Sequence, residues 1–190
     1  MRCFGDGDPL YEAYHDDEWG RPVTTERGLF EKVCLEGFQA GLSWSLVLRR
    51  RASLRDAFAG FDPDALVGWG DRQIDTALEA PGMIRSRAKV SMVVTNARAC
   101  VDLRDAGGLA ELIWSFAPPG RRAAPKRLAD VPAITEESAA MAKALKKAGF
   151  RFVGATTCYA LMQADGLVND HVAGCAVRAA VEADRRAAAR

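Results

Sequence analysis

Cys34-Leu35-Glu36-Gly37-Phe38-Gln39-Ala40-Gly41-Leu42-Ser43-Trp44 is the stretch from which the rest of the chain is best interpreted. On a helix that advances about 100° per residue, the side chains of one stripe project within about 60° of one another: Leu29, Val33, Glu36 and Ala40. An unpaired carboxylate is rare in an apolar stripe, because its burial costs several kcal/mol or forces a pKa shift. The helix runs out at Gly41, and an indole, Trp44, follows. A buried acid beside an indole predicts a pocket for a flat, electron-poor molecule.

Helix signals extend in both directions from this stretch. Period-two strand patterns are lacking, and residues typical of helix N-termini recur at Asp8-Pro9, Thr25, Ser43, Asp62-Pro63, Asp71 and Thr135. A tight turn at 81–84 leads into a long helix over about 86–105. We therefore expect an all-α fold. Its single domain spans residues 1–176, in one or two helical lobes with a shared cleft, and an Ala/Arg-rich end over 177–190 frays or forms a tail.

Composition narrows the class of protein. The chain has 190 residues, 49% of them hydrophobic and 27% charged, which is typical of a globular domain. It has no apolar run of about 18 residues and no apolar segment of a secretory signal near its start. We expect a cytoplasmic protein with no membrane partner. Because the formal net charge is +1, any nucleic-acid contact has to come from local basic patches.

Two Cys and two His lie near the two ends of the chain. Eleven residues separate Cys3 from His15, three separate His171 from Cys175, and there is no other His. Two Cys and two His are a complete tetrahedral set for a structural Zn²⁺. The alternative is two buried thiols and two ordinary imidazoles, and the spacing alone leaves both open. The three other Cys fit as small core residues, and the missing export signal argues against a disulfide framework.

Aromatic side chains concentrate close to the N-terminal pair of candidate ligands. Phe4, Tyr11, Tyr14 and Trp19 lie there, and Trp44 belongs to the stretch quoted first. Any one of them is more often a core residue than a pocket residue. Together they are compatible with a base pocket, since stacking on aromatic side chains holds an unpaired base at about 1–3 kcal/mol per base.

Residues 78–89 read as a helix, a tight glycine turn at Gly82 and a second helix. Arg85, Arg87 and Lys89 follow the turn, where free backbone N–H groups could bind a phosphate. The alternative is an ordinary helical hairpin with a solvated basic rim. The same two interpretations apply to three further basic runs, Arg49-Arg50-Arg51, Arg121-Arg122 and Lys126-Arg127.

Taken together, these stretches resemble the 3-methyladenine DNA glycosylase I family, a divergent branch of the helix-hairpin-helix DNA glycosylases. The resemblance runs from Cys3 to about Cys175. The matching strings are Asp8-Pro9-Leu10-Tyr11, Ala13-Tyr14-His15-Asp16, Glu18-Trp19-Gly20, Leu35-Glu36-Gly37, Gln39-Ala40-Gly41-Leu42-Ser43-Trp44, Asn96-Ala97-Arg98, Trp114-Ser115-Phe116, Lys143-Ala144-Leu145-Lys146-Lys147, Gly149-Phe150, Phe152-Val153-Gly154 and Gly166-Leu167-Val168-Asn169-Asp170-His171.

The resemblance implies a role for each candidate residue. One structural Zn²⁺ per chain is expected to join the termini, through the positions matched by Cys3, His15, His171 and Cys175. Glu36 is expected to contact the excised base as the catalytic residue. The aromatic residues that stack on the base or lie near it are Tyr14, Trp44, Trp19, Tyr11 and Phe4. The expected DNA contacts are Leu42, which probes the gap in the duplex, with Gly82, Arg85 and Lys89. Phe4 and Phe38 depart from the family pattern, and we expect both at the pocket wall.

The implied function is a monofunctional DNA repair glycosylase. It would flip and hydrolytically excise 3-methyladenine from alkylated double-stranded DNA, acting as a monomer and leaving an abasic site without strand cleavage. Because adenine methylated at N3 is cationic on its sugar, Glu36 is expected to recognise that charge more than to donate a proton. One alternative is a catalytically weak protein that binds damaged DNA or alkylpurines. Another is a zinc-stapled helical module for protein contacts.

Overall fold

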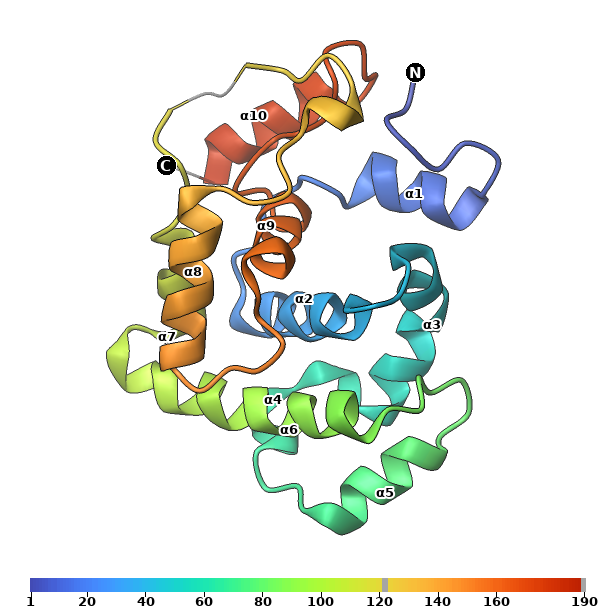
Figure 1. Cartoon of the computed structure of the whole chain (residues 1–190), viewed down its shortest axis with the longest axis vertical. Coiled ribbons are helices and arrows are strands. Elements are labelled where there is room, and N and C mark those ends of the chain that lie inside the picture. The colour runs from blue at the N-terminus through green and yellow to red at the C-terminus, as the bar shows by residue number, and fades with distance from the viewer. Residues whose placement is uncertain (121–122, 189–190) are drawn as a thin grey trace.

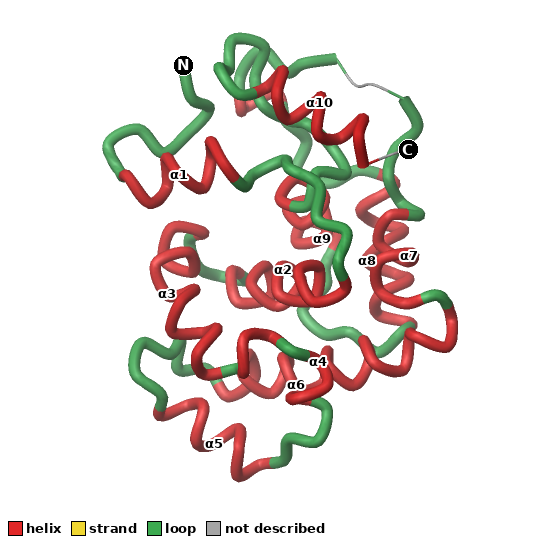
Figure 2. The backbone as a smooth tube through the Cα atoms, turned by 180° about the vertical axis from the view of Figure 1, so that it is seen from behind, coloured by secondary structure: helices red, strands yellow, loops and turns green. Residues whose placement is uncertain are grey.

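The computed structural model describes residues 1–120 and 123–188, and this part of the chain contains helices and no strand (Figures 1 and 2). The all-α prediction is confirmed. The α-helices, in chain order, are α1 (Pro9–Asp17), α2 (Glu26–Gln39), α3 (Trp44–Ala57), α4 (Pro63–Leu66), α5 (Asp71–Glu79), α6 (Arg87–Asp102), α7 (Gly108–Trp114), α8 (Glu136–Lys147), α9 (Ala155–Ala164) and α10 (Arg178–Ala188). Short 3-10 turns occupy Ala59–Phe61, Leu103–Ala106 and Leu128–Asp130.

Helix α2, which carries Glu36, lies at the centre of the molecule (Figure 1). It packs against α3, α6, α7 and α9, and every residue from Lys32 to Phe38 is buried. The sequence predicted one buried stripe, but the middle of α2 is buried on all sides. The predicted stripe also included Ala40, which is exposed. A Cβ atom on Gly37 would lie 2.8 Å from Cε of Met92, so glycine lets α2 and α6 approach closely.

Most predicted helix starts are confirmed by their caps. The side chains of Asp8, Thr25 and Ser43 accept hydrogen bonds from backbone N–H groups in the first turns of α1, α2 and α3. Asp62 and Thr135 do the same for α4 and α8. The prediction that Asp71 caps α5 is wrong, since Gly70 is the N-cap residue and Asp71 is the first residue of the helix.

The two ends of the described chain lie at the same end of the molecule (Figures 1 and 2). The segment after α9 passes close to the segment after α1. A Cβ atom on Gly166 would meet backbone atoms of Arg21 and Pro22 at 2.7–2.8 Å, and Gly166 has a φ of 77°. Helix α10 is docked rather than free, because Val181 is fully buried and Arg185 donates to the carbonyl oxygens of Gly166 and Leu167. The fold thus places residues from both ends beside the central helix.

Membrane insertion has no support in these helices. Over the residues that the structure describes, none of the helices combines the length and the apolar character that a membrane span requires.

Candidate active site and metal centre

A cavity of about 330 Å³ lies between α1, the end of α2, the start of α3, α9 and the turn around residues 128–133. It contains every side chain that was predicted to contact the base. Its lining residues are Phe4, Tyr11, Tyr14, Trp19, Glu36, Gln39, Trp44, Leu128, Val131, Pro132, Ala133, Thr156, Tyr159, Ala160 and Gln163. Phe38 is not among them. It is fully buried against the ring of Phe58, at 5.9 Å between centroids, so its predicted place at the pocket wall is wrong.

Glu36 lies in the last turn of α2 and is 4% exposed. It lines the large cavity and also a smaller one of about 200 Å³ that it shares with Gln39, Ala40, Gly41 and residues of α9. Burial raises the pKa of Glu36 to about 8, and the ammonium group of Lys32 opposes that rise. Within residues 1–120 and 123–188, no group donates a hydrogen bond to its carboxylate. The carboxyl group of Glu36 is therefore buried and can still form hydrogen bonds with a molecule in the cavity.

The positive charge that acts on this acid is the ammonium group of Lys32. The Nζ atom of Lys32 is 5.3 Å from the centroid of the Tyr14 ring and 3.7 Å from an oxygen of Glu18. Arg51 on α3 also donates to Glu18, at 2.7 Å from its Nη2 atom, which ties α3 to the end of α1. Burial, followed by the charges of Glu36 and Glu18, raises the pKa of Tyr14 well above its ordinary value. Tyr14 therefore presents a neutral ring and a protonated hydroxyl.

The aromatic side chains form adjacent walls rather than two parallel plates. The Tyr14 and Trp44 rings are 5.1 Å apart and inclined by 46°. Phe4 lies 4.9 Å from both Tyr11 and Trp19, in a tilted and an edge-on arrangement respectively. A flat base in the cavity can contact both Tyr14 and Trp44, although a sandwich between them would require the rings to separate.

Cys3, His15, His171 and Cys175 come together as predicted from their pairing at the two chain ends. One ligand atom from each lies within 4.8 Å of all the others. The distances from Nδ1 of His171 to the sulfur atoms of Cys175 and Cys3 are 3.2 and 3.6 Å, and Nε2 of His15 is 3.5 Å from Sγ of Cys175. Tetrahedral Zn²⁺, with bonds of about 2.3 Å to sulfur and 2.0–2.1 Å to nitrogen, places neighbouring N and S ligands roughly 3.5 Å apart. The donor set and its spacing fit this metal.

The outer contacts of the cluster hold both imidazoles in the form that a metal ligand needs. His15 directs its Nδ1 to Asp16 at 2.8 Å, and His171 directs its Nε2 to the carbonyl oxygen of Trp19 at 3.0 Å. Hydrogen bonds from Arg2 and His15 lower the pKa of Asp16 to about 2, and burial lowers the pKa of His171 to about 4. The imidazole of His171 is therefore neutral at the cluster. Because Trp19 contacts both His rings and lines the cavity, the cluster also fixes the aromatic wall.

The predicted DNA contacts divide into exposed and buried residues. Leu42 is 36% exposed in the loop between α2 and α3, and Arg85 is exposed after the turn at Gly82. Gly82 has a φ of 76°, and a Cβ atom there would clash with Ser53 of α3. Lys89 is different, because its ammonium group forms hydrogen bonds inside the protein. It donates to the carbonyl oxygens of Phe38 at 2.8 Å and Ala40 at 2.6 Å, so two of its three N–H donors are used inside the protein and the phosphate contact at Lys89 stays a prediction.

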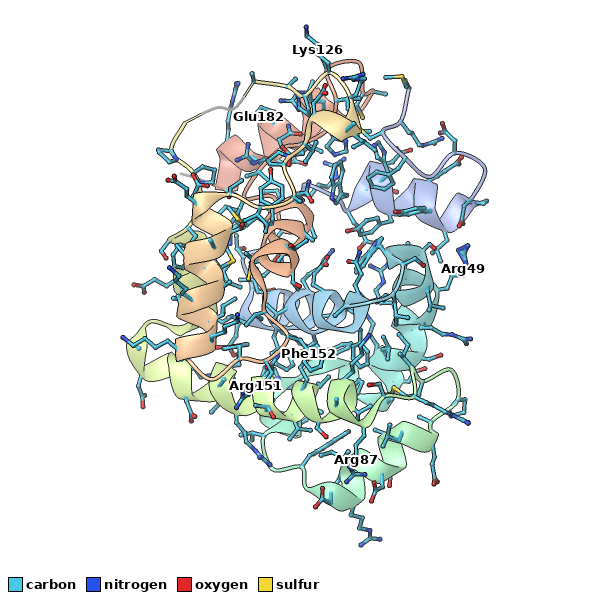
Figure 3. All side chains as sticks on the ribbon, in the orientation of Figure 1. Arg49, Arg87, Lys126, Arg151, Phe152 and Glu182 are labelled. Atoms are coloured by element: carbon cyan, nitrogen blue, oxygen red, sulfur yellow. The ribbon has the colours of Figure 1, made fainter. Side chains whose placement is uncertain are left out.

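The other basic residues are mostly paired on the surface. Arg87 bridges to Asp71 and Asp75 of α5, as Figure 3 shows at the lower end of the molecule. Arg49 pairs with Asp8, and Arg127 with Asp130. Lys126 points outward at the end that carries α10 (Figure 3). The Arg121-Arg122 run lies outside the described residues.

Sequence reasoning missed the cavity wall opposite the aromatic residues. Tyr159 and Gln163 of α9 line the cavity, and both donate to an oxygen of Asp170, at 2.7 and 2.9 Å. Leu128 and neighbouring residues of its turn complete this wall. The only signal was that Asp170 belongs to a string shared with the family, since tyrosine and glutamine on a helix carry no chemistry by themselves.

Comparisons with known proteins agree with this site. A sequence model of the family described as Methyladenine glycosylase matches residues 4–179. DNA-3-methyladenine glycosylase 1 of Escherichia coli is 46% identical over 172 residues, which are 88% of this chain and 91% of the relative. A crystal structure of 3-methyladenine DNA glycosylase I superposes with a TM-score of 0.89 and 46% identity, over 93% of this chain and 98% of the other. A variant 3-methyladenine DNA glycosylase I in complex with 3-methyladenine has a TM-score of 0.88 and 28% identity, over 93% and 96%.

Proposed function

The chain belongs to the methyladenine glycosylase family, and from that premise we propose that it is a DNA repair enzyme that hydrolyses the N-glycosyl bond of 3-methyladenine in alkylated DNA. The observation that carries the proposal is Glu36, a buried carboxyl group without a hydrogen-bond donor among the described residues, facing a cavity with aromatic walls. A purine that is cationic on its sugar matches both features of this cavity.

The reaction follows from how the site treats charge. N3-methylation leaves adenine positively charged in the nucleoside, so the base is already a good leaving group. Removing the base from the DNA stack costs a few kcal/mol. The flipped base then enters the cavity and contacts Tyr14 and Trp44. Its charge lowers the pKa of Glu36, and the resulting carboxylate accepts a hydrogen bond from the exocyclic amine. Water then attacks C1′ and loses one proton to the solvent, and the electron pair of the C1′–N9 bond leaves with the base. Neutral 3-methyladenine and an abasic site remain.

Zn²⁺ is the metal that the four-residue cluster would hold, through Nε2 of His15, Nδ1 of His171 and the sulfur atoms of Cys3 and Cys175. Four protein ligands leave no open position for water, so the ion would supply structure rather than catalysis. Burial raises the pKa of the Cys3 thiol to about 12, and its thiolate at neutral pH therefore requires a cation beside it. About one zinc per purified chain is the expected result of metal analysis.

We further propose a monofunctional enzyme that acts on double-stranded DNA as a monomer in the cytoplasm, within the helix-hairpin-helix superfamily. Leu42 is exposed and suited to fill the gap left by the flipped base, with Arg85 and the turn at Gly82 near the flanking backbone. Among the described residues no Lys lines the cavity, and the ammonium group of Lys32 lies over the ring of Tyr14. A covalent Lys intermediate, which strand cleavage would require, has no support from this arrangement.

Release of 3-methyladenine from methylated duplex DNA tests the proposal. The wild-type chain should release the base and leave sites that break only after alkali treatment. Glu36→Gln keeps the shape of the side chain and removes its charge, and it should slow release at least about 100-fold with zinc content and folding unchanged. Glu79→Gln makes the same change at an exposed position on α5 and should match wild type. Equal release by Glu36→Gln and wild type would remove Glu36 from the mechanism.

The alternative function, a protein that binds alkylpurines or damaged DNA with little turnover, is separated by the same assay. It predicts retention of free 3-methyladenine, measured by calorimetry, without release of the base from methylated DNA. The intact Glu36, Tyr14 and Trp44 in one cavity favour the enzyme.

A further inference from the structure

The wall of the cavity formed by α9 contains a fixed hydrogen-bond acceptor. Gln163 and Tyr159 lie one turn apart on α9 and both line the cavity. The Nε2 atom of Gln163 is 2.9 Å from Oδ2 of Asp170, and the Tyr159 hydroxyl is 2.7 Å from the same oxygen. Asp170 is 7% exposed and Tyr159 is 2% exposed, so both are almost completely shielded from water, whereas Gln163 is partly exposed.

The chemistry of these groups determines which way the Gln163 amide is turned. A carboxylate only accepts hydrogen bonds, and an amide donates through nitrogen and accepts through oxygen. The Gln163 nitrogen must therefore face Asp170, which leaves Oε1 turned away from it. Within the described part of the chain, no group donates to Oε1 of Gln163. The cavity that Gln163 lines is where a donor can reach this oxygen.

We propose that Gln163, oriented by Asp170, presents this acceptor to the six-position edge of the bound purine and so selects 6-amino over 6-oxo alkylpurines. The inference rests on the proposed function and deepens it. The amino group of 3-methyladenine carries two N–H donors, whereas 3-methylguanine has a carbonyl oxygen at the same position. An oxygen facing Oε1 leaves two buried acceptors opposed and unpaired.

Gln163 complements Glu36 because it does not titrate. Protonation turns one oxygen of Glu36 into a donor, so Glu36 alone would tolerate a carbonyl oxygen below its pKa of about 8. The oxygen of Gln163 stays an acceptor while the Gln163 nitrogen donates to Asp170. Gln163 is a specificity residue in direct reach of the base, and Asp170 is a positioning residue that acts through it.

Competitive release from DNA treated with a methylating agent tests the proposal, because such DNA contains 3-methyladenine and 3-methylguanine together. The measured quantity is the ratio of the kcat/KM values for the two bases, obtained by chromatography of released bases. Gln163→Leu removes the acceptor and should lower the ratio of adenine to guanine product about tenfold to hundredfold. Gln73→Leu makes the same change on the exposed face of α5, and its ratio should equal that of wild type.

Asp170→Asn provides the sharper variant. An asparagine can accept from the Gln163 nitrogen or donate to Oε1 of Gln163, so the amide is no longer held in one orientation and its nitrogen can also turn toward the cavity. Release of 3-methylguanine should then rise above that of wild type, a gain that structural damage does not produce. Because Asp170 precedes a candidate metal ligand, zinc content and thermal unfolding are measured for this variant. If it loses zinc, Gln163→Leu and Gln163→Met decide the question.

Each outcome of the test has one meaning. An unchanged ratio in Gln163→Leu and Gln163→Met, or an equal loss for both bases, overturns the acceptor role while release by wild type upholds the proposed function. A wild-type chain that releases neither base overturns the proposed function, and the selectivity inference falls with it.

Discussion

Ionisation of Glu36 should weaken the folded protein as the pH rises. Its ordinary pKa is 4.5, and burial raises the folded value to about 8. An acid whose pKa is raised by folding loses its proton first in the unfolded chain, so its contribution to stability is complete below pH 4.5 and is lost as the pH rises toward 8. At about 1.36 kcal/mol per pKa unit, the loss approaches about 5 kcal/mol. This is an upper limit, because water can enter the cavity and solvate the carboxylate.

Urea unfolding of zinc-loaded wild type and Glu36→Gln, from about pH 5 to about pH 9, measures this loss. The difference in unfolding free energy between the two removes the titration of groups that they share. Wild type should lose several kcal/mol relative to Glu36→Gln across this range. Asp165 and Glu36 are electrostatically coupled, so the pair of proteins is repeated in an Asp165→Ala background. A difference that stays flat with pH would show that Glu36 is well solvated in the folded state, and the charge-recognition argument would fail.

Three further predictions concern groups around the site. Asp165→Ala should stabilise the protein by about 1–3 kcal/mol at pH 8 and less at pH 5, measured by thermal unfolding. Both carboxyl oxygens of Asp165 are buried and have no hydrogen-bond partner among the described residues, and burial raises the pKa of Asp165 well above its ordinary value. Asp16→Asn should weaken zinc affinity about 10–100-fold in chelator competition, since Asp16 orients His15; equal affinity would contradict that role. Lys89→Met should increase hydrogen exchange at residues 40–43 by removing the ammonium that binds the end of α2, whereas unchanged protection there would argue that the loop holds itself.

What the sequence could predict depends on how local the signal is. Helix starts at Asp8, Thr25 and Ser43 follow from side chains that bond to backbone groups two or three residues away, and these are correct. The Cys/His cluster is long-range, and its residue types and spacing left two interpretations open; the family resemblance implied that the four residues come together, which they do. Lys89 shows the limit of such reasoning. Its place after a turn indicates a surface cation, and only the packing of α6 on α2 reveals the carbonyl oxygens that its long side chain reaches.

The burial of Lys32 on α2 could not be predicted for a similar reason. Lys32 and Glu36 are one turn apart, a spacing that usually marks a solvated ion pair on a helix surface. In the fold both are buried, and the residues that make this possible come from distant segments: Glu18 accepts the charge of Lys32, and α9 closes the far side. The Gln163–Asp170 contact also depends on α9 and the following loop meeting in three dimensions, which no spacing in the sequence specifies.

The placement of Lys32 indicates how the cavity distinguishes a cationic base from a neutral one. The Tyr14 ring already has an ammonium group 5.3 Å from its centroid, so a second cation on this ring gains less from it than it would at a free tyrosine. Recognition of charge therefore falls mainly to Glu36. With a pKa of about 8, Glu36 is mostly protonated in the empty cavity at neutral pH and adds no buried charge. A cationic base lowers the pKa of Glu36, so the proton leaves to the solvent and the carboxylate forms a pair with the base that has no net charge. Normal adenine provides no charge to offset ionisation, so it meets a protonated, uncharged Glu36 and is bound more weakly.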